Sequence, residues 1–133
     1  DKSERRLDLY ADGEILRSYA ISLGGQPVGP KRREGDERTP EGRYFIDYRK
    51  PDSAFHRALH ISYPRPGQVA AARARGEPPG GLIMIHGLSR RRALIGRYNL
   101  LSDWTIGCIA VTNAEIEELW RVVPDGTPIE IRP

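Results

Sequence analysis

The 133-residue sequence has a single cysteine, Cys108, and no long hydrophobic run. One cysteine excludes an internal disulfide, so the thiol is either a small buried apolar group or a free thiol kept for its chemistry. A membrane-spanning helix needs about 20 consecutive apolar residues, so we expect no transmembrane segment in this chain. No basic and apolar leader is found at Asp1, and we expect that a signal or anchor was cleaved or lies outside this sequence.

The chain also has only a small excess of positive over negative charge. The 21 basic residues exceed the 18 acidic residues by only +3, which falls short of the dense basic surface that nucleic acids require, so we expect no nucleic-acid partner. The hydrophobic fraction is 38%, which is ordinary for a globular chain. A chain of this length has room for one core, and we expect one domain over residues 1–133.

Alternating apolar residues and turn signals predict several short strands. Asp12-Gly13 between two apolar runs favours a hairpin from Leu7 to Ile21, and residues 24–42 are rich in Gly, Pro and charge, which predicts a loop. Further strands are expected at 43–48, 59–63, 82–85 and 129–131. In the strand at 43–48 we expect Tyr44, Ile46 and Tyr48 to share one face.

One helix is clearly marked near the C-terminus. Thr112 and Glu115 have capping-box spacing, apolar residues follow at helical intervals, and Pro124 ends the run. A shorter Ala-rich helix is expected at 69–75. Many strands with few helices predict a mostly β fold with a short helical part, of the α+β class: a sandwich or curled sheet with a helix packed beside it.

Cys108 and His86 form the one combination that suggests catalysis. A thiol attacks an acyl carbon only as thiolate and needs a base nearby, and His86 follows a predicted buried strand and precedes glycine. Gly107 permits close approach of the substrate, and the amides of Gly107 and Cys108 are candidate oxyanion donors. The third group of a triad is open between a backbone carbonyl near Gly87 and the Asp103 side chain.

A structural interpretation competes with this one. On composition alone, Cys108 among Ile106, Ile109 and Val111 is more typical of a core residue, and His86 of a structural histidine. Periodicity leaves both interpretations open.

Three segments carry a resemblance to a known family: Gly35–Tyr44, Ile83–Gly87 and Thr105–Ile109. They resemble the L,D-transpeptidase catalytic domain, or YkuD domain, in which a His-Gly pair precedes a Ser/Thr-x-Gly-Cys element. Residues 103–113 are similar to the YafK-like branch of Gram-negative envelopes. The likeness implies an L,D-transpeptidase-like curled sheet, with Cys108 as nucleophile, His86 as general base and Gly107 in the oxyanion hole.

The resemblance implies acyl transfer on peptidoglycan stem peptides through a Cys108 thioester, in the periplasm and without a cofactor. A hydrolase that cleaves peptidoglycan-peptide or peptidoglycan-lipoprotein linkages is the alternative, so an outer-membrane lipoprotein is a second expected partner. A peptidoglycan-binding module without turnover is the non-enzymatic alternative. The residues expected to contact the substrate are Thr105, Gly87, Trp104, Tyr63 and Arg92.

This chain departs from the family pattern in ways that affect substrate contacts. Ile106 and Ala110 stand where many members have polar residues, and the stretch from His86 to Thr105 is slightly longer than usual. Its arginines, Arg90 to Arg92 and Arg97, either meet carboxylates of an anionic peptide or form a solvated charge run. We expect Lys31-Arg32-Arg33 to be plain surface.

The histidines at 56 and 60 have the spacing of a helical zinc pair. In a strand they would lie about 13 Å apart, at roughly 3.3 Å per residue, which is too far for one ion. We therefore expect no metal site.

Overall fold

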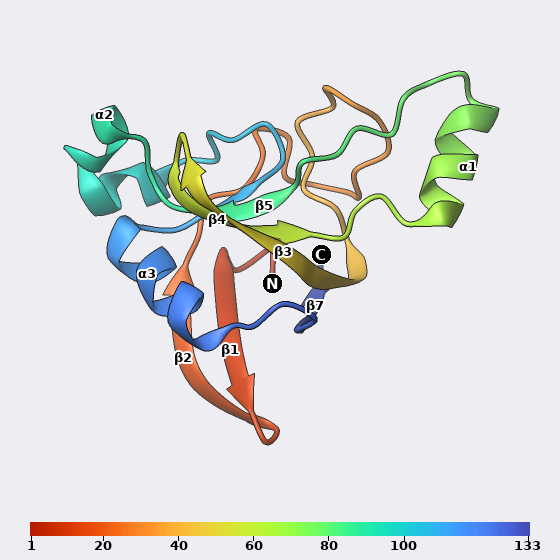
Figure 1. The fold of residues 1–133 in the computed structure, drawn as a ribbon. Helices are drawn as coiled ribbons and strands as arrows, with labels where there is room; N and C mark the ends of the chain where they lie inside the picture. The colour runs from red at the N-terminus through yellow and green to blue at the C-terminus, as the bar shows by residue number, and fades with distance from the viewer.

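The computed structural model describes residues Asp1–Pro133 and contains two sheets. A two-stranded sheet, β1 (Arg6–Ala11) and β2 (Glu14–Ala20), projects from a larger five-stranded sheet (Figure 1). The larger sheet has the order β6-β5-β4-β3-β7. Its strands are β3 (Gly42–Ser53), β4 (His56–Ile61), β5 (Met84–His86), β6 (Ile109–Ala110) and β7 (Pro128–Ile131). The expected mostly β, curled-sheet fold is confirmed.

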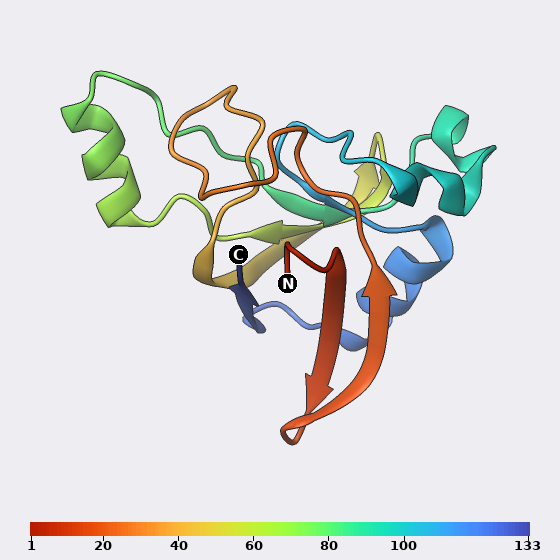
Figure 2. The same ribbon diagram turned by 180° about the vertical axis from the view of Figure 1, so that it is seen from behind.

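The N-terminal hairpin forms as the Asp12-Gly13 signal predicts. Both residues have positive φ, 52° and 79°, which matches the twist of the flanking strands in a two-residue turn. Tyr19 is only 1% exposed and belongs to the core. The hairpin therefore closes the core from below, as seen from both sides in Figures 1 and 2.

Strands β3 and β4 form the long antiparallel pair at the centre of the larger sheet. The register steps from Ile46↔Ile61 to Tyr48↔His60, so β3 carries one extra residue there. Because a bulge reverses the alternation of side chains, Tyr48 is 43% exposed and stacks on His60, whereas Tyr44 and Ile46 are buried. The expectation that all three share a buried face was wrong at Tyr48.

Four helical segments connect or flank the strands. They are α1 (Pro66–Ala74), α2 (Arg90–Ala93), the 3-10 helix η1 (Gly96–Leu101) and α3 (Asn113–Val122). The expected capping box of α3 is present between Thr112 and Glu115, and Ile116 and Leu119 on its inner face are buried. The sequence reasoning missed α2 and η1, because a four-residue helix and a single 3-10 stretch show no usable periodicity. No helix has the length and apolar character needed to cross a membrane.

The core brings the two ends of the chain together. Sixteen buried residues from both sheets and α3 form one cluster, and Lys2 N donates to Arg132 O (2.9 Å). In Figure 2 the N- and C-termini lie close to each other beneath the larger sheet. Loops 21–41 and 101–108 lie on the opposite side of that sheet from the β1–β2 hairpin (Figure 2).

Candidate active site

Pairing of β5 with β6 brings the two expected catalytic residues to one edge of the sheet. The strands run parallel with Ile85↔Ile109 and His86↔Ala110 in register, and Val111 N donates to His86 O (3.0 Å). Cys108 directly precedes β6, so it lies close to the strand that ends in His86. Residues 22 positions apart in the sequence thus become neighbours through a strand pair too short for sequence patterns to reveal.

His86 has a defined tautomer. Its Nδ1 lies 2.7 Å from the carbonyl oxygen of Gly87. A carbonyl can only accept, so Nδ1 carries the proton and Nε2 keeps its lone pair. Burial lowers the pKa of His86, although the hydrogen bond to Gly87 opposes this. The ring is therefore neutral near pH 7 and can act as a base through Nε2.

Two aromatic rings hold the imidazole in place. Phe55, in the turn between β3 and β4, stacks on His86 at 4.4 Å, and Trp104 meets the ring edge-on at 5.8 Å. His86 is only 4% exposed as a result. Sequence reasoning missed Phe55, since nothing in the sequence indicates that a β-hairpin turn reaches the end of another strand.

Gly87 allows helix α3 to pack against the histidine. A Cβ at Gly87 would lie 2.5 Å from Asn113 Oδ1 and 2.9 Å from Ile116 Cγ2. Asn113 Oδ1 accepts the Leu88 N–H (2.7 Å) and so fixes the backbone just after Gly87. The carbonyl that orients His86 is thereby anchored by the first residue of α3.

Cys108 is held as a neutral thiol. Its Sγ donates to the Leu82 carbonyl at 3.4 Å. Burial raises the pKa of the Cys108 thiol, while the Met84 N–H and the charge of Lys31 act to lower it. No hydrogen bond joins Cys108 to His86 here, so the resting pair consists of an uncharged thiol and an uncharged imidazole.

Hydrogen bonds of the Thr105 side chain hold the turn before Cys108. Thr105 Oγ1 donates to Cys108 O (2.7 Å) and accepts the Gly107 N–H (3.1 Å). Gly107 has φ +138°, and a Cβ there would lie 2.9 Å from Arg38 O. The Gly107 N–H thus already has a partner within the turn, and its expected part in an oxyanion hole stays a prediction. The Thr105 hydroxyl is likewise occupied within the turn, which leaves the Cys108 N–H as the free donor.

Asp103 does not form a hydrogen bond with His86. Its carboxylate forms a bidentate contact with Arg5 (2.8 Å to Nη2) and accepts the Leu23 N–H (3.0 Å). These partners tie the loop before Cys108 to the N-terminal segment. Of the two candidates for the third group of the triad, the Gly87 carbonyl is the one that contacts His86 Nδ1.

Arg92 and Trp104 contact each other beside His86. The Arg92 guanidinium lies 3.8 Å from the centre of the Trp104 ring and donates to Asn99 Oδ1 (3.2 Å). The Trp104 Nε1–H is buried and has no hydrogen-bond partner. Arg92 thus covers the tryptophan, and it is partly buried while Arg90 and Arg91 are exposed.

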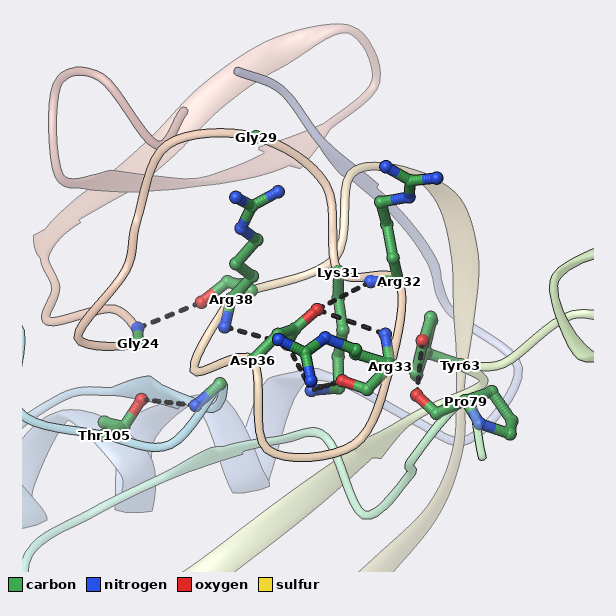
Figure 3. Close-up of polar contacts among 12 residues, drawn as sticks. Gly24, Gly29, Lys31, Arg32, Arg33, Asp36, Arg38, Tyr63, Pro79 and Thr105 are labelled. Carbon is green, nitrogen blue, oxygen red and sulfur yellow. Dashed lines mark hydrogen bonds and ion pairs between the residues drawn. The ribbon is translucent and has the colours of Figure 1, made fainter. Parts of the chain in front are cut away.

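Tyr63 does not border a groove, contrary to our expectation. It is 3% exposed and its hydroxyl donates to Pro79 O (2.7 Å; Figure 3). Burial, reinforced by the charge of Asp36, raises the pKa of Tyr63 to about 12. Its role is therefore to pack the sheet against the segment after α1.

Lys31 also differs from the expectation that it is plain surface. Its side chain is 3% exposed and its Nζ lies 2.8 Å from Asp36 Oδ1.

The two histidines considered as a metal pair have separate carboxylate partners, His56 with Glu117 (2.8 Å) and His60 with Asp47 (2.6 Å).

Comparison with known proteins assigns the family. The model of the L,D-transpeptidase catalytic domain, YkuD, matches residues 1–131. The chain belongs to the YkuD family. Within the YkuD family it is 38% identical over 128 residues to YafK of Escherichia coli (strain K12), which is named as a candidate L,D-transpeptidase; the alignment covers 92% of this chain and 44% of YafK.

Solved structures of YkuD relatives agree with the fold. The helical cell shape determining protein Pgp2 of Campylobacter jejuni superposes with a TM-score of 0.74 at 27% identity, over 98% of this chain and 45% of Pgp2. An L,D-transpeptidase of Mycobacterium smegmatis superposes with a TM-score of 0.62 at 17% identity, over 98% of this chain and 55% of that protein, and shares the fold. The chain thus spans about half the length of these relatives.

Proposed function

We propose that this YkuD domain catalyses acyl transfer on a peptidoglycan stem peptide through a thioester on Cys108, in the periplasm. The observation that carries the proposal is the fixed Nδ1–H tautomer of His86, which leaves Nε2 free as a base at the end of β5, the strand paired with the one that directly follows the chain's one thiol. Names of the relatives, which refer to L,D-transpeptidases and to cell shape, favour the same class of substrate.

The reaction begins when His86 Nε2 removes the Cys108 proton and the thiolate attacks a peptide carbonyl carbon. The Cys108 N–H, free of partners within the chain, donates to the developing oxyanion. His86 then returns the proton to the leaving amine as the C–N bond breaks and the thioester remains. An incoming amine or water, deprotonated by His86, attacks the thioester and releases the thiol.

The group that resolves the thioester decides between two outcomes. An amine gives a crosslink or attaches a lipoprotein, whereas water gives a hydrolase that cleaves peptide or lipoprotein linkages in the wall. Both share the first half-reaction and use the same residues. The name of YafK favours the transferase as the first candidate.

The neutral resting pair gives the reaction a pH dependence. Burial raises the pKa of Cys108, so little thiolate exists at neutral pH, and burial lowers the pKa of His86, so the imidazole is a competent base down to mildly acidic pH. Alkylation of Cys108 by iodoacetamide should therefore increase with pH through neutrality and continue to increase above pH about 9, near the ordinary value for a thiol.

The decisive experiment is mass spectrometry after incubation with muropeptides or a carbapenem. We expect a covalent adduct on Cys108, its absence in Cys108→Ala, and slower adduct formation in His86→Ala by about 100-fold or more, because general base catalysis contributes on that order. Wild-type protein that forms no adduct and leaves muropeptides unchanged would favour a wall-binding module instead. A muropeptide digest separates crosslinks from cleavage products.

A further inference from the structure

The loop from Lys31 to Arg38 is organised by one carboxylate, that of Asp36. Its Oδ1 accepts from Lys31 Nζ (2.8 Å) and Arg38 N (3.1 Å), and its Oδ2 accepts from Arg32 N (2.8 Å) and Arg33 N (3.1 Å), as Figure 3 shows in part. Three arginines are therefore fixed through their backbone amides. Their side chains take no part in holding the loop.

These arginines line a recess with a volume of about 540 Å³ that no hydrophobic side chain enters. Arg75 and Glu77 also line it and pair with each other at 3.3 Å, and Arg75 Nη2 donates to Arg32 O (2.8 Å). In Figure 3 the side chains of Arg32 and Arg38 point the same way, away from Asp36. The recess thus presents several guanidinium groups on a rigid frame.

The charges of the recess are not balanced by the protein. The Arg32, Arg33 and Arg38 guanidinium groups form no hydrogen bond or ion pair within the chain, and Glu37 is the one lining carboxylate without a cationic partner. Three free cations thus face one free anion. Guanidinium groups bind carboxylates in paired hydrogen bonds, so a ligand with two or more carboxylates fits this excess charge.

The recess adjoins the turn that carries Cys108. A Cβ added at Gly24 would lie 2.1 Å from Glu37 O and 3.1 Å from Gly107 Cα, and one added at Gly107 would lie 2.9 Å from Arg38 O. The Arg38 backbone is therefore packed directly against Gly107, which precedes the thiol, and the Glu37 backbone packs against Gly24 beside it. The loop that carries the arginines is therefore a direct neighbour of the turn at which a peptide substrate would be attacked.

We infer that the Arg32–Arg38 recess is a subsite for an acidic peptide, in which the guanidinium groups bind carboxylates that take no part in the reaction. This inference rests on the proposed function and adds the substrate feature that the domain selects. Glu37 offers a contact for an amino group of the same peptide. The subsite places the acidic part of the peptide beside Gly107 and so directs its reactive carbonyl toward Cys108.

Binding is tested in the Cys108→Ala background, so that no turnover occurs. The probes are a stem tetrapeptide released from peptidoglycan and the same peptide with its carboxylates amidated, and Kd is measured by calorimetry at low salt. We expect the free carboxylates to tighten binding by about tenfold or more, and R32Q/R38Q to remove this difference. The double variant R90Q/R91Q loses the same charge from another exposed loop and is the matched control.

Three results would overturn the subsite. They are an unchanged preference in R32Q/R38Q, an equal loss of preference in R90Q/R91Q, and displacement of the tetrapeptide by inorganic phosphate at a similar concentration, which indicates a general anion site. Adduct formation by a carbapenem is measured separately on R32Q/R38Q with Cys108 intact. A normal adduct there means that the proposed chemistry holds even if the subsite fails.

Discussion

Two arginine-rich loops border the candidate active site, and they place their charges differently. In the loop of α2 and η1, Arg92 lies over Trp104 and the exposed Arg90 and Arg91 have no partners within the chain. In the loop from Lys31 to Arg38, a buried ion pair fixes the backbone and leaves three guanidinium groups facing a recess.

The difference lies in what each loop is built around. Asp36 is a buried anion that accepts from one ammonium and three backbone amides, whereas Asn99, 2% exposed, is a neutral centre that bonds Arg92 and Gly96. The Asp36 carboxylate pairs with one cation, Lys31, and holds the nearby arginines only through their backbone amides, so their guanidinium groups stay free. The Asn99 amide donates to the Arg92 and Gly96 carbonyls and accepts from the Arg92 guanidinium (3.2 Å), so it holds the one arginine side chain that lies over Trp104.

Removing the charged centre should have the largest effect. In Asp36→Asn the buried ammonium of Lys31 loses its counter-ion, and we expect the free energy of unfolding to fall by about 2–4 kcal/mol. Chemical denaturation measures this. Lys31→Met is the paired variant and should cost less, because Asp36 keeps its three backbone donors; an equal or larger cost in Lys31→Met would contradict the central role of Asp36.

The same variant has a distinctive acid profile. Burial tends to raise the pKa of Asp36, but the Arg32 amide, Lys31 and the other amides outweigh it and hold the pKa at about 2, below the ordinary 3.8. A depressed folded pKa adds stability that is present above the ordinary value and is lost as the pH falls through about 2. The stability difference between wild type and Asp36→Asn should therefore shrink between pH about 4 and 2, and a constant difference would argue against the shift.

Removing the neutral centre should have a smaller and more local effect. Asn99→Ala leaves the Arg92 and Gly96 carbonyls without their donor (2.8 and 2.7 Å), which costs about 1–2 kcal/mol. We expect faster hydrogen exchange of amides in residues 90–101 and no change in residues 31–38. Faster exchange in both loops would show that the two regions are coupled.

The smallest expected effect concerns Arg92. Arg92→Met keeps the aliphatic stem over Trp104 and removes the cation, at a cost of about 1 kcal/mol or less in unfolding free energy. Tetrapeptide binding in the Cys108→Ala background should change by less than about twofold, in contrast to R32Q/R38Q. A loss of carboxylate preference in Arg92→Met would instead indicate that the loop of α2 and η1 contacts the peptide.

Prediction from sequence succeeded where the signal was local. Asp12-Gly13 marked the first turn, the Thr112 and Glu115 pair marked the start of α3, and the apolar run before His86 marked β5. It failed at Tyr48, because a bulge is an insertion relative to a partner strand. A bulge has no signature in one strand taken alone.

The candidate site also contains residues that the sequence identified and residues that it did not. Cys108 and His86 were identifiable from residue type and motif, but Phe55 and Asn113, which hold the ring and the Gly87 backbone, were not. Their contributions depend on a hairpin turn and a helix N-terminus reaching the same strand end. Such contacts arise from packing, and residues far apart in the chain give no pattern that predicts them.

The amino-acid sequence by itself determined the family motif, the nucleophile and base candidates, and the balance of charge. Only the tertiary structure decided which groups are free to act. The Gly87 carbonyl sets the tautomer of His86, and the Thr105 hydroxyl accepts the Gly107 N–H. Asp36 pairs with the Lys31 ammonium and leaves the neighbouring guanidinium groups free. The physical reason is that a group can bind a substrate only through the hydrogen-bonding capacity that no other residue of the folded chain already uses. That capacity is known only when every partner brought close by folding has been counted.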